Sequence, residues 1–252
     1  MGRVDGKVCL VTGGGSGLGR ADAIRLAEEG AQVVVTDVDA AAGEETVALA
    51  GNNATFMLHD VADEARWQAV ISATLERFGK LNVVVNNAGI VIPGTVESTT
   101  TEDWRLQQQI HMDGVFFGLK YGIGAMKDNG ELGSIINMSS TTALQGYAMV
   151  FAYGAAKGAI RTMTKHAAVH CVNMGYKIRV NSLHPGVINT PMVQNLGAGA
   201  APPPDTPRPS MGNVGLGDPT DVANTVLFLA SDESRFINGV ELPIDNTATI
   251  QP

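Results

Sequence analysis

The sequence predicts an α/β fold, a doubly wound parallel sheet of about seven strands with helices on both faces. Short β-branched runs alternate with helical patterns along all 252 residues, and right-handed crossovers then place helices on both sides of one sheet. The runs are apolar nearly throughout, as strands covered on both faces must be. Glycines and polar residues collect where these runs end, which is the edge where such sheets bind ligands. We therefore expect a single domain over residues 1–252 with its site at that edge.

The strands are predicted from the apolar runs, and the helices from the patterns between them. The strands cover residues 7–12, 31–37, 54–60, 81–89, 133–140, 177–186 and 239–245. A first helix is expected over 18–30, because Leu18, Ala21, Ile24 and Ala27 share a face and Gly30 provides a C-terminal stop. Further helices are expected at 63–79, 101–127, 153–174 and 219–231. The Pro- and Gly-rich stretch at about 193–215 is expected to be a mobile loop above the substrate.

Composition and charge exclude several classes of function. The net charge is −8 and the isoelectric point is about 5.0, without a cluster of Lys or Arg, which argues against nucleic acid and anionic membranes as partners. No apolar run approaches the length of a membrane span, and the N-terminus does not resemble a signal peptide. Cys9 and Cys171 lie in apolar patterns and are expected to be buried thiols in a reducing compartment. We expect a cytoplasmic protein.

A glycine-rich turn follows the first strand. In "VTGGGSGLG", Gly13, Gly17 and Gly19 have the spacing G-x-x-x-G-x-G. Without Cβ atoms, such a turn lets a diphosphate approach backbone N–H groups at a helix N-terminus. The alternative is a glycine-rich connection that binds nothing, but its position after the first strand favours a dinucleotide.

Asp37 ends the second strand and indicates which dinucleotide is bound. A carboxylate there accepts hydrogen bonds from an adenosine ribose and repels a 2′-phosphate. No Lys or Arg stands at Val38 or Ser16, where a phosphate-binding cation would be placed. The prediction is NAD rather than NADP, although an isolated Asp is also typical of a solvent-facing turn.

The stretch "YGAAK" places Tyr153 and Lys157 on one face of a helix, one turn apart. Flanking apolar residues such as Phe151 and Ile160 suggest that this helix is largely buried. A cation beside a phenol favours the phenolate, and a phenolate can exchange protons with an alcohol near neutral pH. A solvent-exposed pair without chemistry is the alternative.

Five motifs together resemble the short-chain dehydrogenases/reductases. They are TGxxxGxG at 12–19, NNAG at 86–89, a serine at 140, YxxxK at 153–157 and PGxIxT at 185–190. They occur in the family's order and cover essentially the whole chain. The similarity is greatest to bacterial NAD-dependent hydroxysteroid and cyclic-alcohol dehydrogenases, and it implies a Rossmann-type fold and the oxidation of an alcohol or the reduction of its ketone.

The resemblance also implies roles for single residues. Tyr153 is the acid/base, Ser140 holds the substrate oxygen, and Lys157 contacts the nicotinamide ribose and lowers the pKa of Tyr153. Thr12 and Asn86 brace the backbone of the site. Besides Tyr153 and Lys157, the residues expected to bind the cofactor are Gly13, Ser16, Gly17, Leu18, Gly19, Asp37, Val38, Asp60, Val61, Asn87, Ala88, Gly89, Pro185, Gly186, Ile188 and Thr190.

One position departs from the family pattern. The family usually has Asn in VNxxGxF, where it orients a water that relays protons to the lysine, whereas "QIHMDGVFFG" places His111 there. Because imidazole shuttles protons and titrates near neutrality, we count His111 among the candidate catalytic residues. The alternative is that His111 only fills the space.

The residues expected around the substrate are uncharged, which favours a hydrophobic, cyclic secondary alcohol of the steroid, terpenol or cyclohexanol type. They are Thr142, Leu144, Tyr147, Val150, Val187 and Met192. The charged fraction of 17% is low, and helices 101–127 and 153–174 carry apolar residues on more than one face. With the family resemblance, this predicts a homotetramer. A catalytically impaired NAD-binding regulator or scaffold of the same fold is the alternative function.

Overall fold

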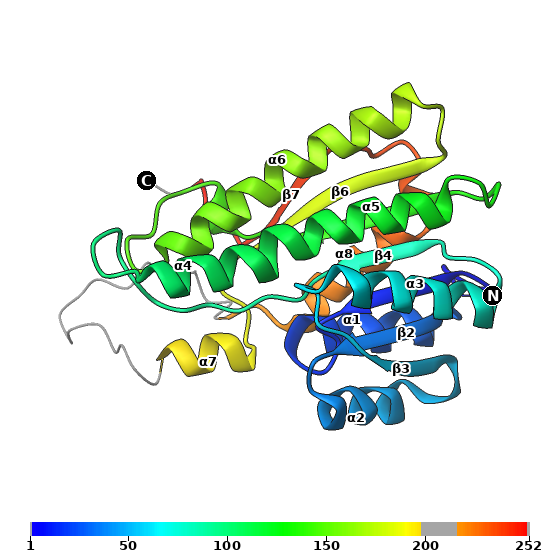
Figure 1. The fold of residues 1–252 in the computed structure, drawn as a ribbon, viewed down its shortest axis with the longest axis horizontal. Coiled ribbons are helices and arrows are strands. Elements are labelled where there is room, and N and C mark those ends of the chain that lie inside the picture. The colour runs from blue at the N-terminus through cyan, green and yellow to red at the C-terminus, as the bar shows by residue number, and fades with distance from the viewer. Residues whose placement is uncertain (1, 198–215, 251–252) are drawn as a thin grey trace.

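The computed structural model describes residues 2–197 and 216–250, and it places seven parallel strands in one sheet (Figure 1). The strand order is β3-β2-β1-β4-β5-β6-β7. The bounds are β1 Val8–Thr12, β2 Gln32–Asp37, β3 Ala54–Leu58, β4 Val83–Asn86, β5 Gly133–Met138, β6 Ile178–Pro185 and β7 Glu241–Ile244. Each expected strand is therefore present, and the doubly wound parallel sheet is confirmed. The order reverses beside β1, so the carboxyl ends of β1 and β4 diverge there and open a crevice.

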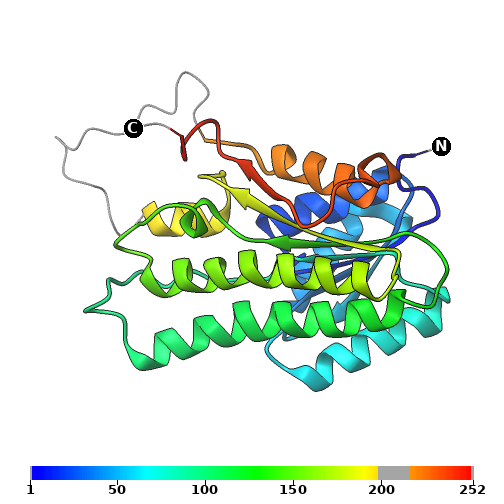
Figure 2. The ribbon, with the colours of Figure 1, turned by 90° about the horizontal axis from the view of Figure 1, so that it is seen from above.

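Helices cover both faces of the sheet (Figure 2). Helices α1 (Gly17–Glu28), α2 (Ala40–Ala50) and α8 (Pro219–Ala230) lie on one face, and α3 (Glu64–Phe78), α4 (Thr101–Gln108), α5 (Gly114–Met126) and α6 (Phe151–Asn173) lie on the other. The short helix α7 (Pro191–Gly197) follows β6.

The two layers of core follow from the alternation of side chains along each strand. Val33 and Val35 of β2 pack into the cluster with α1 and α8, whereas Val34 packs into the cluster with α3, α5 and α6. Both faces of the strand are buried because successive side chains point to opposite sides. This is why both faces of β2 carry valines.

Side chains cap the N-termini of helices such as α3 and α8. The Asp63 carboxylate accepts hydrogen bonds from the backbone N–H groups of Ala65 and Arg66 at the start of α3. Asp218 and Asp221 form a capping box at the start of α8, with Pro219 in the first turn. These caps satisfy N–H groups that have no partner within the helix.

The structure differs from the expected elements in three places. The helix expected over 101–127 is present as one helical run, but it contains a π turn at Gln109–Asp113 between α4 and α5. Helices α2 and α7 were not among the predicted elements. Of the loop expected at 193–215, residues 193–197 belong to α7 and residues 198–215 lie outside the described part of the chain.

Within residues 2–197 and 216–250, no helix combines the length and the hydropathy needed to cross a bilayer.

Candidate active site

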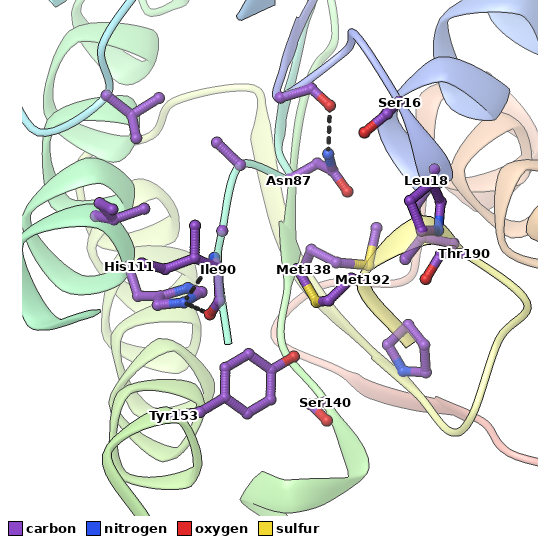
Figure 3. A pocket seen from close by; sticks show the side chains of 18 of the residues that line it. Ser16, Leu18, Asn87, Ile90, His111, Met138, Ser140, Tyr153, Thr190 and Met192 are labelled. Atoms are coloured by element: carbon purple, nitrogen blue, oxygen red, sulfur yellow. Dashed lines mark hydrogen bonds between the residues drawn. The ribbon is translucent and has the colours of Figure 1, made fainter. Parts of the chain in front are cut away.

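A cleft of about 340 Å³ lies at the carboxyl ends of the strands (Figure 3). It brings together the four candidate catalytic residues and every predicted cofactor residue except Gly19. Its lining consists of Gly13, Ser16, Gly17, Leu18, Asp37, Val38, His59, Asp60, Val61, Asn87, Ala88, Gly89, Ile90, Ile110, His111, Met138, Ser139, Ser140, Tyr153, Lys157, Pro185, Gly186, Ile188, Thr190, Pro191, Met192 and Val193.

The glycine-rich turn is shaped by close backbone approaches. Gly13 has φ +63°, and a Cβ there would lie 2.7 Å from Ala88 Cα. Gly19 does not line the cleft, but a Cβ at this position would lie 2.2 Å from the Gly13 carbonyl oxygen. Gly19 therefore lets the first turn of α1 pack against the loop, and its contribution to the cleft is indirect.

The segment after β4 is tied to the glycine-rich turn by side-chain hydrogen bonds. Asn87 Nδ2 donates to the carbonyl oxygen of Thr12 (2.9 Å) and to that of Gly13 (3.2 Å). In return, Thr12 Oγ1 accepts from the N–H groups of Asn87 (3.0 Å) and Ala88 (3.1 Å). These bonds hold the two walls of the crevice at a fixed separation, which is the bracing role expected of Thr12.

Asp37 lies at the opposite end of the cleft from Tyr153, and backbone groups hold its carboxylate. Oδ2 accepts from the Gly15 N–H (2.9 Å) and Oδ1 from the Asp39 N–H (3.0 Å). The neighbouring Arg20 is engaged elsewhere, since its Nη2 donates to the Gly15 carbonyl (2.6 Å) and to Glu45 (2.7 Å). Among the lining residues, Lys157 is the only Lys or Arg. The described residues that line the cleft around Asp37 therefore include no free Lys or Arg for a 2′-phosphate.

Tyr153 and Lys157 lie on the first turns of α6, where Lys157 is buried and Tyr153 is partly buried. Lys157 Nζ donates to the Met138 carbonyl oxygen (2.7 Å) and lies 5.3 Å from the centroid of the Tyr153 ring. Figure 3 shows the phenol oxygen of Tyr153 pointing into the cleft on the side of Ser140, whose hydroxyl favours the phenolate. The Ser140 hydroxyl also accepts from the Thr142 N–H (3.2 Å).

Burial dominates the acidity of this pair. Burial raises the pKa of Tyr153 to about 12, and the Ser140 hydroxyl offsets this rise only in part. Burial also lowers the pKa of Lys157 to about 7, so the amine of this side chain is only partly protonated at neutral pH. Desolvation of the phenolate therefore dominates the pKa of Tyr153, and the lowering of this pKa by Lys157 stays a prediction.

His111 lies in the π turn and packs against the site. It is completely buried, its Nε2 is 2.8 Å from the Ile90 carbonyl oxygen, and its ring meets the edge of Tyr153 at a centroid distance of 5.4 Å. A Cβ on Gly89 would lie 2.4 Å from His111 Cε1, so the glycine is required by the imidazole. Burial lowers the pKa of His111 to about 3, and the expectation of a titration near neutrality is wrong.

The tautomer of His111 follows from its partner. Nε2 lies 3.3 Å from the Ile90 backbone nitrogen and 2.8 Å from the Ile90 carbonyl oxygen. The shorter contact is with a group that only accepts, which favours the tautomer with the hydrogen on Nε2. Nδ1 is then a buried acceptor without a partner in the described structure. His111 is a neutral group that holds the backbone after β4.

Of the six residues expected around the substrate, only Met192 lines the cleft. Val150 lies away from the lining, where it forms a bridge with Gly94. The side chains of Tyr147 and Val187 are 45% and 43% exposed. The two others outside the lining are Thr142 and Leu144. Thr142, Leu144, Tyr147 and Val150 follow Ser140 in sequence, but they lie in the turns between residues 141 and 150 and do not line the cleft.

Several lining residues were missed by the sequence reasoning. Met138 and Ser139 precede Ser140 at the end of β5, and Ile90 follows the NNAG motif, so extending each strand end by one or two residues finds them. Ile110 depends on the π turn, which the apolar pattern does not reveal. The others are His59, Pro191 and Val193.

The comparisons with known proteins agree with this geometry. A family model described as "Enoyl-(Acyl carrier protein) reductase" matches residues 13–249. The NADP-dependent (R)-specific alcohol dehydrogenase of Lentilactobacillus kefiri is 44% identical, with 99% of each chain covered. The 3-beta-hydroxysteroid dehydrogenase of Comamonas testosteroni is 43% identical and covers 97% of this chain and 96% of its own.

A solved structure extends the agreement to the fold. The crystal structure of levodione reductase superposes with a TM-score of 0.90 at 34% identity, covering 98% of this chain and 99% of its own. The sheet order, the cleft at the strand ends and the full-length relatives all lead to one assignment. The chain belongs to the short-chain dehydrogenase/reductase family of oxidoreductases.

Proposed function

We propose that the protein is an NAD-dependent dehydrogenase that interconverts a hydrophobic, cyclic secondary alcohol and its ketone. The observation that carries this proposal is the arrangement of one cleft. The side chains of Ser140, Tyr153 and Lys157 and that of Asp37 line the same cleft. Asp37 ends β2 and Ser140 follows β5, with β1 and β4 between them in the sheet.

The residues fit such a cofactor, and its nicotinamide ring would supply the hydride acceptor when bound. The carboxylate of Asp37 would accept from the adenosine ribose, and the close approach at Gly13 would admit the diphosphate to the N-terminus of α1. Lys157, which lines the cleft beside Tyr153, would contact the second ribose.

In alcohol oxidation, the Ser140 hydroxyl would donate to the substrate oxygen and hold it against the Tyr153 phenol. Tyr153 would take the hydroxyl proton as the phenolate, and in ketone reduction it would return that proton as the neutral phenol. Burial already brings the pKa of Lys157 to about 7. The ammonium form of Lys157 is the only nearby cation of the lining that favours the phenolate.

The substrate class follows from the side chains near Ser140 and Tyr153. Ile90, Met138, Ile188 and Met192 contribute apolar surface to this part of the cleft, and Lys157 is the only Lys or Arg among the described lining residues. Methionines adapt their shape to a bulky apolar partner. The relative named for a hydroxysteroid supports the same class.

A screen of turnover tests the proposal. The purified protein is mixed with NAD or NADP and a series of cyclic and linear secondary alcohols, and the absorbance of the reduced cofactor is followed. We expect activity with cyclic alcohols and NAD. Binding of NADH without turnover of any alcohol or ketone would favour the alternative of a regulator or scaffold.

The preference for NAD is tested at Asp37, since one relative uses NADP. The variant Asp37→Asn keeps the volume and an acceptor for the Gly15 N–H but removes the charge. We expect kcat/KM with NAD to fall by about 10- to 100-fold, because a hydrogen bond to a charged group contributes about 1.5–3 kcal/mol. We expect kcat/KM with NADP to rise as the repulsion is lost. A wild-type protein that prefers NADP would contradict the role given to Asp37.

We propose that His111 acts in the reaction as a neutral group, through Ile90 and the Tyr153 ring. With the pKa of His111 near 3, His111→Asn is expected to leave the pH dependence of kcat unchanged between about pH 5 and 8, the range in which an ordinary histidine titrates. The measurement is kcat against pH for both proteins. Loss of an ionisation in that range would restore the proton-shuttle hypothesis.

We further propose a homotetramer in a reducing compartment such as the cytoplasm. Helices α5 and α6 expose apolar side chains that a monomer would leave in water, including Phe116 (49% exposed), Val169 (59%) and Val172 (64%). Contiguous exposed apolar surface is typical of subunit contacts. The two cysteines are free and buried, which agrees with a reducing environment.

A further inference from the structure

His184 lies behind the cleft, outside its lining, and contacts one of the catalytic candidates. It is the next-to-last residue of β6 and is completely buried. Its Nδ1 lies 3.1 Å from the carbonyl oxygen of Ser140, and its Nε2 lies 3.0 Å from Ser182 Oγ. A carbonyl oxygen only accepts, so Nδ1 carries the hydrogen and Nε2 is an acceptor. The single hydrogen of the Ser182 hydroxyl has two acceptors within reach, Nε2 at 3.0 Å and the Val240 carbonyl oxygen at 3.3 Å.

The hydrogen bond between His184 and Ser140 lies where the parallel sheet can no longer form a backbone hydrogen bond. The Ser139 N–H donates to the Leu183 carbonyl oxygen (2.8 Å), and a regular parallel ladder would continue with a bond from the N–H of residue 185 to the Ser139 carbonyl. Pro185 has no N–H, and the pairing of β5 with β6 ends at Met138 and Leu183. The next link between the two chain segments is the imidazole of His184.

The Ser140 hydroxyl depends on where its backbone is held. The Ser140 carbonyl oxygen also accepts from the Ala143 N–H (3.0 Å), and its Oγ accepts from the Thr142 N–H. Those two contacts come from the turn that follows Ser140 and move with it. Among the hydrogen bonds of the described residues, the one from His184 is the only one that ties Ser140 itself to the sheet, so it sets the position of the hydroxyl relative to Tyr153 on α6.

The surroundings keep the imidazole neutral. Burial is the main cause of the lowered pKa of His184, and Arg161 and Lys157 of α6 lower it further. Glu241 of β7 and the bond to Ser140 act in the opposite direction. A neutral ring with its hydrogen on Nδ1 donates to Ser140 and leaves Nε2 as an acceptor.

We propose that His184 is a positioning residue that anchors the Ser140 carbonyl through Nδ1–H and thereby holds the Ser140 hydroxyl against the Tyr153 phenol. The inference rests on the proposed function, which assigns Ser140 and Tyr153 to the reacting atoms. His184 itself touches neither substrate nor cofactor.

Three substitutions at one position test it. The amide nitrogen of Asn is attached to Cγ, as imidazole Nδ1 is, so His184→Asn places a donor near the Ser140 carbonyl. In His184→Gln the amide nitrogen is one bond further out, at the place of Nε2, and His184→Leu has no donor. Thermal unfolding of each variant checks that it folds.

We expect the Leu and Gln variants to lose about 10- to 100-fold in kcat, the cost of a small misplacement of a catalytic group. The KM for NAD should stay unchanged, because the cofactor contacts are intact, and the Asn variant should recover most of the lost rate. Wild-type kcat in the Leu and Gln variants, or an Asn variant as slow as the Gln variant, would overturn the proposal. If the Leu variant does not fold, the comparison of Asn with Gln decides.

A second measurement does not need turnover. Solid-state ¹⁵N spectra of the histidine-labelled wild type, with His184→Gln used for assignment, report which ring nitrogen carries the hydrogen. An Nδ1–H tautomer is expected, and an Nε2–H tautomer would overturn the anchor. If the wild type turns over no alcohol or ketone, the proposed function fails while this tautomer still tests the contact with Ser140.

Discussion

Replacing Tyr153 with Phe is expected to lower kcat by about 10²- to 10⁴-fold, the contribution of a well-placed general acid or base. Phe keeps the ring, whose centroid lies 5.4 Å from the centroid of the His111 ring and 5.3 Å from Lys157 Nζ. It lacks only the proton that Tyr153 exchanges with the substrate oxygen. The measurement is steady-state turnover in both directions, with an alcohol and with the matching ketone.

Two controls separate chemistry from folding in the Phe variant. The affinity for NADH, followed by fluorescence, should stay measurable, because every other predicted cofactor residue is intact, and assays at saturating NADH then report kcat alone. The unfolding midpoint should not fall, because burial of the hydroxyl is only partly compensated by Ser140. A Phe variant that retains a tenth or more of the wild-type kcat would show that another group transfers the proton.

Replacing Gly118 with Ala is expected to destabilise the fold by about 3–5 kcal/mol, through overpacking and a disrupted buried hydrogen bond. A Cβ at this position of α5 would lie 2.0 Å from Asn86 Oδ1 and 2.7 Å from its Cγ. Asn86 has little room to withdraw, because its Nδ2 donates to Asn137 Oδ1 (2.8 Å) and Asn137 donates in turn to Thr164 Oγ1 (2.9 Å). Chemical denaturation should show a lower midpoint with an unchanged slope.

A double-mutant cycle identifies the contact responsible. Asn86→Ala removes the oxygen that meets the new methyl group, so Gly118→Ala should cost much less in the Asn86→Ala background than in the wild type. Equal costs in the two backgrounds would show that the methyl group is accommodated elsewhere. A single Gly118→Ala variant as stable as the wild type would contradict the close approach itself.

The sequence predicted the sheet well because the information for it is local. Strands such as β2 and β4 are buried on both faces, and a continuous apolar run records this directly. The cofactor end of the cleft was also predictable, since Gly13, Asp37 and Asn87 each stand at a strand end, and parallel strands bring their carboxyl ends together.

Other features depend on contacts that no local pattern carries. The directions of Thr142, Tyr147 and Val150 are set by turns, and only Met192 among the expected substrate residues lines the cleft. The acidity of Tyr153 and His111 depends on how deeply each is buried, which is a property of the folded chain. The spacing of Tyr153 and Lys157 indicates that they are neighbours but not that desolvation outweighs their attraction.

The π turn at Gln109–Asp113 has a consequence for the length of this segment. Each residue of a helix advances the chain by about 100° around its axis, so the additional residue of a π turn rotates all of α5 relative to α4. With this rotation Val115, Gly118 and Leu119 face the sheet. A single deletion between α4 and α5 would turn these side chains toward solvent and withdraw the imidazole from Ile90. Active variants of this protein can therefore carry substitutions between α4 and α5, but we expect them to keep the number of residues in Gln109–Asp113.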